Sequence, residues 1–381
     1  MNIQRDLPVT HIVIGTKAQF IKMAPIARLL QESGWPYRLL DLGQHGSITP
    51  GIVSDFGLEA DHLHVLPPGA TVTTYSQALH WVLAAISRIA SPRRALSAEL
   101  VKQPAGYALV HGDTLSTILG LHLARRLRLR LGLVEAGLSS GKLFDPFPEE
   151  LIRRHVEKRA NMLFAPDDVS AERLRARSLK GEVVSTEYNT GRDALLLIAA
   201  KNGRNADRQQ TFSTVLTLHR AETISRSSRL REIIGHVIRL APEIGRIRFF
   251  LHEPTRRALI RANLLEPLTD NSHFELVPLG SYPEFTKALA RSRYILTDGG
   301  SIQEEASYLN KPCLILRRTT ERQQGIGTTA MLTSFDVETD LEFLHAKAHD
   351  GSISAALTPS LRAARIIVEH LYPRAFPVAG D

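Results

Sequence analysis

Several side chains able to move a proton follow apolar runs of the sequence. Glu135 comes directly after one such run, Asp113 follows another after two intervening residues, and Glu149 lies in a loop a little further on. His219 follows another apolar run in the second half of the chain. Carboxylates and imidazoles are common general acids and bases in enzymes. A carboxylate at the end of a buried strand, as expected for Glu135, is partly desolvated and needs a partner or a function. These side chains therefore indicate acid/base catalysis.

Most of these side chains also have a structural interpretation. Asp113 precedes Thr114 and a helical pattern, so it could cap a helix instead of doing chemistry. Glu149 and Glu150 would lie in the first turn of a helix, where the helix dipole favours carboxylates, so one of the two is expected to be structural. A lone histidine after a strand, such as His219, is more often a hydrogen-bonded loop residue than a catalyst.

Two glycine-containing turns each lie between an apolar strand and a helix. The first is Gly15-Thr16-Lys17, with Lys22 one helical turn further on, and the second is Thr297-Asp298-Gly299-Gly300-Ser301. The N–H groups at the start of a helix are unpaired and lie at the positive end of its dipole, so such turns stabilise phosphate groups. One turn of this kind is weak support, but one in each half indicates a nucleotide held between two similar domains.

Short apolar strands alternate with helical patterns along most of the chain. Strands are predicted near residues 11–14, 38–42, 107–111, 131–135 and 162–165, and again near residues 214–218, 248–251, 274–277, 293–296 and 313–316. Apolar strands joined by helices predict parallel sheets covered on both faces. We therefore predict an α/β fold of two Rossmann-like domains, residues 1–200 and 201–360, with a polar linker at 201–210. A last helix within 361–381 is expected to pack back on the first domain.

Ligands of such sheets bind beyond the carboxyl ends of the strands. The candidate residues follow strands in both halves, so we expect them to converge on a cleft between the domains. The length of 381 residues supports two domains, because a single hydrophobic core usually stops growing at a smaller size.

Composition narrows the class of ligand. The net charge of +8 suits an acidic ligand. Aromatic residues make up 6% of the chain and offer no stacking platform for single-stranded nucleic acid, so no nucleic acid partner is predicted. Arginines within residues 125–130 fall at a predicted helix end, where cations favour the dipole. A small acidic ligand such as a nucleotide diphosphate is the predicted partner.

The single cysteine, Cys313, excludes an internal disulfide and a cysteine-built metal cluster, and no metal site is predicted. No segment approaches the roughly 20 apolar residues that a membrane span needs, and the N-terminus shows no signal-peptide pattern. We therefore predict a cytoplasmic protein with no membrane partner.

A series of short motifs occurs in a recognisable order. They are Gly15-Thr16-Lys17, Gly43-Gln44-His45, His111-Gly112-Asp113-Thr114, Val134-Glu135-Ala136-Gly137-Leu138, Pro148-Glu149-Glu150, His219-Arg220, Ile302-Gln303-Glu304-Glu305-Ala306 and Thr319-Thr320-Glu321-Arg322. From about residue 11 to residue 325, this order resembles the UDP-N-acetylglucosamine 2-epimerase family. The resemblance implies a glycosyltransferase-B type fold with UDP in the interdomain cleft, no cofactor and a homodimer. It also implies a mechanism: loss of the C2 proton and of UDP gives a 2-acetamidoglucal, and UDP then adds back to give the manno epimer.

The resemblance assigns roles by position. It places the acid/base carboxylates on Asp113, Glu135 and Glu149 and the cleft histidine on His219. It places UDP contacts on Lys17, Lys22, Arg220, His252, Gly299, Gly300, Ser301, Glu305 and Arg322, with Glu305 on the ribose hydroxyls. In allosterically controlled members a second UDP-sugar, UDP-N-acetylglucosamine, binds near the motif that contains Gln44 and His45.

The chain departs from the family pattern around the diphosphate. Lys17-Ala18-Gln19 stands where the family usually has Arg-Pro-Glu, which replaces a bidentate fork with a point charge. Ser139 replaces an arginine, and Gly299-Gly300-Ser301 replaces Ser-Gly-Gly. These changes leave the exact sugar open. Gly46-Ser47 likewise leaves open whether the allosteric site is present.

The predicted activity is that of an isomerase, a UDP-N-acetylglucosamine 2-epimerase that feeds cell-surface polysaccharide precursors. Two related alternatives stand beside it: a hydrolysing epimerase that releases N-acetylmannosamine and UDP, and an epimerase of UDP-2,3-diacetamido-glucuronate. A glycosyltransferase or a non-catalytic nucleotide-sugar binder is the alternative from another class. The retained carboxylates argue against a binder, because anionic groups beside a diphosphate repel it unless they do proton chemistry.

Overall fold

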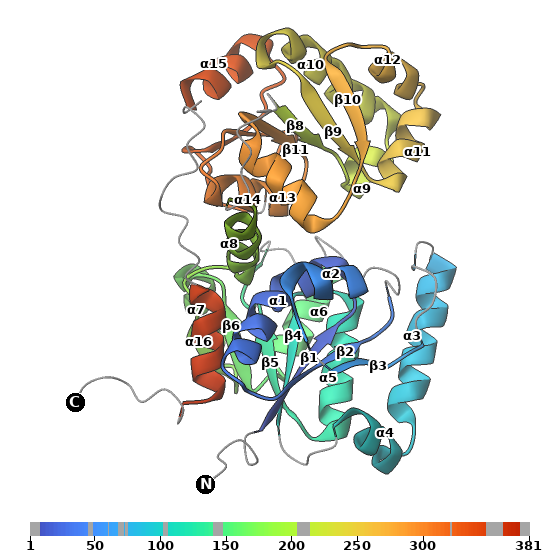
Figure 1. Ribbon diagram of the computed structural model, residues 1–381, viewed down its shortest axis with the longest axis vertical. Coiled ribbons are helices and arrows are strands. Elements are labelled where there is room, and N and C mark those ends of the chain that lie inside the picture. The colour runs from blue at the N-terminus through green and yellow to red at the C-terminus, as the bar shows by residue number, and fades with distance from the viewer. Residues whose placement is uncertain are drawn as a thin grey trace, which may run out of the picture. The chain divides into compact units, whose positions relative to one another are not determined.

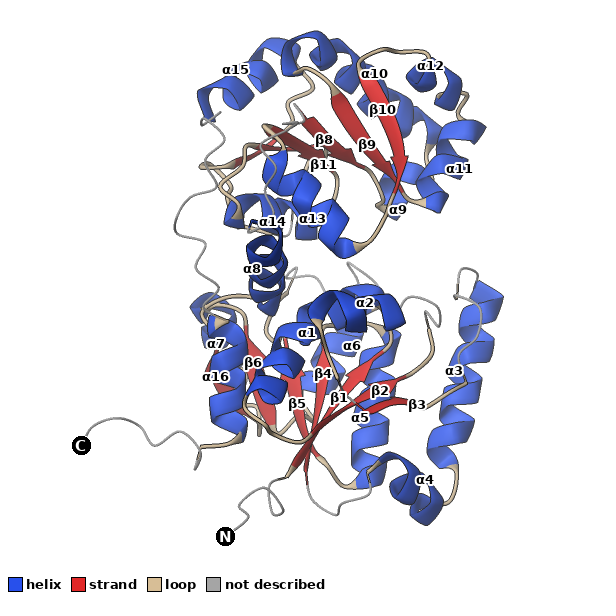
Figure 2. Ribbon diagram, in the orientation of Figure 1, coloured by secondary structure: helices blue, strands red, loops and turns tan. Residues whose placement is uncertain are grey.

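The computed structural model describes residues 8–44, 49–59, 61–67, 72, 75–101, 106–139, 148–203, 214–320, 322–347 and 361–373. The chain divides into two compact units. Unit 1 comprises Met1–Leu197 and Pro359–Asp381, and unit 2 comprises Ile198–Thr358 (Figure 1). Each unit contains one parallel β-sheet with helices packed around it (Figure 2).

The sheet of unit 1 has the strand order β3-β2-β1-β4-β5-β6-β7. Its strands are β1 (Val9–Ile14), β2 (Tyr37–Asp41), β3 (Asp61–His64), β4 (Gly106–His111), β5 (Arg130–Val134), β6 (Met162–Ala165) and β7 (Glu182–Ser185). Its helices are α1 (Lys17–Glu32), α2 (Thr49–Phe56), α3 (Tyr75–Ala90), α4 (Arg93–Leu100), α5 (Leu115–Leu127), α6 (Glu149–Glu157), α7 (Asp168–Arg175) and α16 (Arg362–Leu371), while α8 (Thr190–Gly203) crosses into unit 2.

The sheet of unit 2 has the strand order β10-β9-β8-β11-β12-β13. Its strands are β8 (Thr214–Thr217), β9 (Ile247–Leu251), β10 (Phe274–Pro278), β11 (Tyr294–Thr297), β12 (Cys313–Ile315) and β13 (Ala330–Leu332). Its helices are α9 (Ala221–Ile224), α10 (Ser227–Ile244), α11 (Glu253–Arg261), α12 (Leu265–Thr269), α13 (Tyr282–Arg291), α14 (Gly300–Tyr308) and α15 (Val337–Lys347).

Both sheets are doubly wound, as predicted. In unit 1, β1, β2 and β3 follow one another toward one edge of the sheet, and β4 then lies on the other side of β1. Unit 2 has the same arrangement, with β8 in the place of β1 and β11 in the place of β4. At such a switch point the loops that follow two neighbouring strands separate, which leaves a crevice for a ligand. A ligand is therefore expected at the ends of β1 and β4 in unit 1 and of β8 and β11 in unit 2.

The central strands are rich in apolar residues, which favours their burial. All six residues of β1 are buried. On one face of the sheet, Val13, Leu40 and Val110 pack against residues of α3 and α5, such as Trp81 and Leu119. Burial on both faces favours apolar residues, and for this reason the central strands of both units could be predicted correctly from the sequence.

The C-terminal helix α16 packs against α1 within unit 1. Tyr372, which follows it, donates its hydroxyl hydrogen to the carbonyl oxygen of Pro8 at 2.6 Å and lies 2.7 Å from the hydroxyl of Thr10 on β1. The N–H group of Ala364 donates to buried Asp193 at 2.8 Å. Helix α16 and Tyr372 are thus fixed to the first strand and to α8.

The structure differs from the prediction in several places. Strands β3 and β7 were not predicted because they are short and carry polar residues, and β13 was not predicted because it has only three residues. Helix α8 continues to Gly203, so the predicted linker 201–210 begins inside a helix, and residues 204–210 lie outside the described ranges. Strand β5 ends at Val134, one residue earlier than predicted. Across the described residues, no helix combines the length and apolar character that spanning a bilayer requires.

Candidate active site

The side chain of Gln19 ties together the two turns at the switch point of unit 1. Its Oε1 accepts hydrogen bonds from the N–H groups of Gly15 and Thr16, at 3.1 and 3.2 Å, and from the hydroxyl of Ser116 at 2.7 Å. Its Nε2 donates to the carbonyl oxygen of His111 at 2.7 Å. Gln19 is 3% exposed, and every polar atom of its amide is used. The ends of β1 and β4 are therefore held in one fixed arrangement.

Glu135 is the most constrained carboxylate of this region. Its φ of 64° lies in the left-handed region, which is uncommon for residues other than glycine and costs about 1–3 kcal/mol. The side chain is nearly buried, and its Oε1 accepts from Nζ of Lys22 at 2.8 Å and from Nδ2 of Asn189 at 2.5 Å. Its Oε2 lies 3.3 Å from Nε2 of His111. A cation and fixed donors hold this carboxylate in a strained position, which is a typical feature of functional sites.

Asp113 and helix α6 are joined by one arginine. Arg153 forms ion pairs with Asp113 and, at 2.5 Å, with Oε2 of Glu150. The N-cap of α5 is Thr114, so the interpretation of Asp113 as a helix cap is wrong. Asp113 instead lies beside the guanidinium group of Arg153 on α6, at the end of β4 where a ligand is expected.

The structure separates the two glutamates that begin α6. Glu150 accepts from Ser139 at 2.8 Å and pairs with Arg153 and Arg154. Burial alone would raise the pKa of Glu150, but the hydrogen bond from Ser139 and the two arginines hold this pKa below its usual value. Glu149 has a buried Oε2 with no hydrogen-bond partner among the described residues. Glu150 is therefore the structural member of the pair, and Glu149 is the one available for proton chemistry.

Lys17 and Gln44 lie at the same end of the unit 1 sheet, after β1 and β2. Lys17 begins α1 and is half-buried, and this burial lowers the pKa of its amino group, although Asp55 acts in the opposite direction. Gln44 has a buried Oε1 without a hydrogen-bond partner in the described part of the chain. His45 lies outside the described residues.

Asp298 organises the switch point of unit 2. Its carboxylate is fully buried and accepts hydrogen bonds from the backbone N–H groups of His219 at 3.0 Å and of Arg220 at 3.1 Å. The same carboxylate lies 3.5 Å from Nδ1 of His219. The ends of β8 and β11 are thereby joined, as the ends of β1 and β4 are in unit 1.

The imidazole of His219 lies against the glycine turn. A Cβ atom added to Gly299 would be 2.3 Å from Cε1 of His219, so glycine is required for this close approach. Burial lowers the pKa of His219, although Asp298 opposes this shift. Burial thus favours the neutral ring, which can act as a hydrogen-bond donor. His252, the N-cap of α11, lies beside it with ring centroids 5.4 Å apart.

Helix α14 begins directly after this turn. Gly299 is its N-cap, and the N–H groups of the first helical turn, at Gly300 and Ser301, lie at the positive end of the dipole. Glu305 lies in this helix, and its carboxylate accepts a hydrogen bond from the hydroxyl of Tyr282 at 3.2 Å. Further on, Arg322 pairs with Glu304 at 2.8 Å. The glycine turn thus presents the start of a helix beside side chains that are held in place by hydrogen bonds and ion pairs.

Several residues that hold these groups in place were not predicted from the sequence. They are Gln19, His111, Asn189, Arg153 and Asp298. His111 and Asp298 lie inside quoted motifs and follow strands, so their positions could have signalled a role. Asn189 has no such signal, because only the tertiary fold brings it to Glu135.

These features define a class of protein. Two doubly wound sheets of the glycosyltransferase-B type each present a fixed turn and polar side chains at the switch point, and unit 1 adds several carboxylates at the carboxyl ends of its strands. The sequence pattern described as UDP-N-acetylglucosamine 2-epimerase matches residues 86–350. The chain therefore belongs to the UDP-N-acetylglucosamine 2-epimerase family, a family of isomerases, which confirms the predicted resemblance.

Individual relatives agree with this result. The UDP-N-acetylglucosamine 2-epimerase of Methanocaldococcus jannaschii is 27% identical over 333 residues, which cover 84% of this chain and 86% of the relative. A crystal structure of the UDP-GlcNAc 2-epimerase of that organism, in complex with UDP-GlcNAc and UDP, has a TM-score of 0.75 at 25% identity and covers 96% and 99% of the two chains. The Neisseria meningitidis enzyme bound to UDP-GlcNAc also has a TM-score of 0.75 at 25% identity and covers 95% and 99%.

Proposed function

We propose that this protein interconverts UDP-N-acetylglucosamine and UDP-N-acetylmannosamine by elimination and re-addition of UDP, and so supplies precursors of cell-surface polysaccharide. The observation that carries the proposal is Glu135, a buried carboxylate held in a strained conformation by Lys22 and Asn189. Relatives named as UDP-N-acetylglucosamine 2-epimerases, some of them solved with UDP-GlcNAc bound, support the choice of substrate.

The carboxylates of unit 1 would perform the proton chemistry. One of Asp113, Glu135 and Glu149 removes the C2 proton while the bond from C1 to the diphosphate oxygen breaks, which leaves a C1–C2 double bond and free UDP. Re-addition of UDP at C1, with a proton delivered to the other face of C2, gives the epimer. Oε2 of Glu149 has no hydrogen-bond partner within the described part of the chain, whereas Asp113 is ion-paired, so the two carboxylates differ as two opposite proton transfers require.

Unit 2 would stabilise the departing diphosphate. The N–H groups at the start of α14 and the neutral imidazole of His219 are donors suited to developing negative charge. In the same proposal Lys17, Lys22, Arg220 and Arg322 supply positive charge, His252 a hydrogen bond, and Glu305 holds the ribose hydroxyls. Because elimination and re-addition exchange only a proton and UDP, the reaction as proposed uses no cofactor.

Heavy water distinguishes the candidate functions in one experiment. The C2 proton of UDP-N-acetylglucosamine is expected to be replaced by deuterium, and both the gluco and manno products should carry the label while still linked to UDP. The measurement is NMR of the sugar ring after incubation with the purified protein.

Each other candidate gives a different result. Labelled free N-acetylmannosamine with accumulating UDP would identify the hydrolysing reaction, which remains the alternative within the family. Exchange only in UDP-2,3-diacetamido-glucuronate would change the substrate. Tight UDP binding without deuterium at C2 in either sugar would contradict the epimerase and favour a transferase or a binder.

We also propose that the protein is a homodimer, in which a second copy covers α3. Leu79, Leu83 and Ile86 lie on one side of this helix at helical spacing and are 59%, 56% and 52% exposed. Contiguous exposed apolar side chains of this kind are typical of interaction surfaces. Leu83→Asp is expected to halve the mass found by light scattering while the circular dichroism spectrum is unchanged. A wild-type protein that is already monomeric would contradict the proposal.

A further inference from the structure

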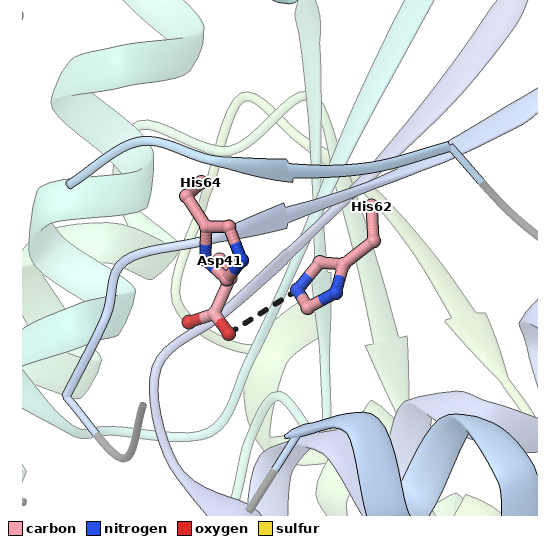
Figure 3. Close-up of side chains that lie close together, drawn as sticks. All are labelled: Asp41, His62 and His64. Atoms are coloured by element: carbon pink, nitrogen blue, oxygen red, sulfur yellow. Dashed lines mark hydrogen bonds and ion pairs between the residues drawn. The ribbon is translucent and has the colours of Figure 1, made fainter. Parts of the chain in front are cut away.

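Strands β2 and β3 bring an aspartate and two histidines together in unit 1. Asp41 is the last residue of β2, and its register partner on the edge strand β3 is His64. Paired residues of neighbouring strands share a face of the sheet, and so do residues two apart on one strand, which adds His62 to the same face. Figure 3 shows the three side chains gathered in one place.

The separations within this cluster suit a metal ion. One potential ligand atom of each side chain lies within 4.8 Å of those of the other two. Nε2 of His62 is 3.3 Å from Oδ2 of Asp41. Two ligands of a tetrahedral zinc ion are roughly 3.4 Å apart, given metal–ligand bonds of about 2.0–2.1 Å. The pair Asp41 and His62 already has this separation, and a small rotation of side chains would bring His64 to the same ion.

Hydrogen bonding alone accounts poorly for the cluster. The distance of 3.3 Å between His62 and Asp41 is longer than a usual hydrogen bond. Nδ1 of His64 is buried and has no hydrogen-bond partner among the residues described. Asp41 is 2% exposed, and its Oδ2 is the oxygen nearer to His62. A divalent cation between these side chains would give the buried nitrogen of His64 a partner.

The carboxylate of Asp41 is held in position by the backbone. Its Oδ1 accepts a hydrogen bond from the N–H group of Gly43 at 2.7 Å, while Oδ2 is the oxygen nearer to His62. Metal-ligating carboxylates are commonly oriented by such additional hydrogen bonds. The turn that follows β2 thus fixes the one anionic group of the cluster before any ion binds.

We propose that Asp41, His62 and His64 bind one divalent transition-metal ion, and that Zn²⁺ is the ion that fits this ligand set best. Zinc accepts two imidazoles and a carboxylate with one position left for water. Magnesium and calcium prefer oxygen ligands, so the two histidines disfavour them. The ion would join the edge strand β3 to β2 and stabilise the turn that carries Gln44. The site lies on strands other than β4 and β5, whose ends carry Asp113 and Glu135, so we assign the ion no step of the proposed reaction.

Metal binding by the purified full-length chain tests this proposal. After treatment with a chelator, calorimetry is expected to show one Zn²⁺ bound per chain, and Co²⁺ should give a visible absorption spectrum typical of tetrahedral or five-coordinate nitrogen and oxygen ligation. His62→Gln and His64→Gln are each expected to weaken Zn²⁺ binding by at least about 100-fold, because each removes one ligand of three. Zn²⁺ should raise the midpoint of thermal unfolding in the wild type, but not in these variants.

A matched control comes from His80 on α3. This side chain is exposed and contacts the carbonyl oxygen of Ser76, so His80→Gln should bind Zn²⁺ like the wild type. Asp41 is buried, so its replacement tests folding as well as binding, and the histidine variants carry the conclusion. The proposal is overturned if the wild type fails to bind Zn²⁺ at concentrations of about 100 µM, or if the double variant His62→Gln/His64→Gln binds as tightly as the wild type.

Discussion

Glu135→Gln is expected to lower turnover by about two to four orders of magnitude while UDP still binds. The change removes one charge and keeps the shape of the side chain. It also removes the carboxylate that pairs with Lys22 at 2.8 Å in a nearly buried site. The measurement is the initial rate of deuterium exchange at C2, compared with UDP affinity from calorimetry.

A second buried carboxylate of unit 1 provides the control. Glu157 accepts from the N–H group of Gly137 and pairs with Arg177, and it has no place in the proposed reaction. Glu157→Gln is expected to cost stability and to leave the exchange rate of the folded protein nearly unchanged. A fully active Glu135→Gln protein would remove Glu135 from the chemistry, whatever the behaviour of the control.

Gly299→Ala is expected to lower turnover by about two to three orders of magnitude, the usual effect of losing one donor to developing charge. The new methyl group would collide with Cε1 of His219, which lies 2.3 Å from the position of the added Cβ. The imidazole is a side chain that can rotate away, so the protein should still fold, but His219 would leave its place beside Asp298. Steady-state kinetics and the thermal unfolding midpoint measure the two effects separately.

Gly235→Ala is the matched control for this change. Gly235 lies within α10 of the same unit, and an added Cβ would meet only Nη1 of Arg239, at 3.8 Å. Alanine favours a helix interior by roughly 1 kcal/mol over glycine, so this variant should be as active as the wild type and slightly more stable. If Gly299→Ala retains wild-type turnover, His219 does not assist departure of the diphosphate from its observed position.

The central architecture could be predicted because burial on both faces leaves a clear trace in sequence. The apolar runs of β1 and β4 were recognised, and the rule that ligands bind at the ends of such strands led to Asp113 and Glu135. Edge strands leave a weaker trace, since one side is open to solvent and polar residues are tolerated. For this reason β3, with its sequence Asp61-His62-Leu63-His64, was missed, and the expectation that the chain has no metal site was formed without it.

The partners of the site residues were harder to predict than the residues themselves. Glu135 was identified from its position after an apolar run, but its contact with Asn189 joins residues 54 positions apart and depends on the tertiary fold. The division of roles between Glu149 and Glu150 was likewise expected, but only the positions of Ser139 and Arg153 show which of them is structural. Sequence motifs identify the residues that could do chemistry, whereas the residues that contact them and hold them in place depend on tertiary packing.

The left-handed backbone at Glu135 has a consequence for protein engineering. Glycine adopts this conformation without strain, so a redesign guided by backbone geometry alone would favour glycine at this position. Such a redesign would remove the proposed acid/base group and the carboxylate that pairs with Lys22. Attempts to increase the thermal tolerance of this chain should therefore hold residue 135 fixed and seek their gains away from the switch points, for example on the exposed faces of α10 or α15.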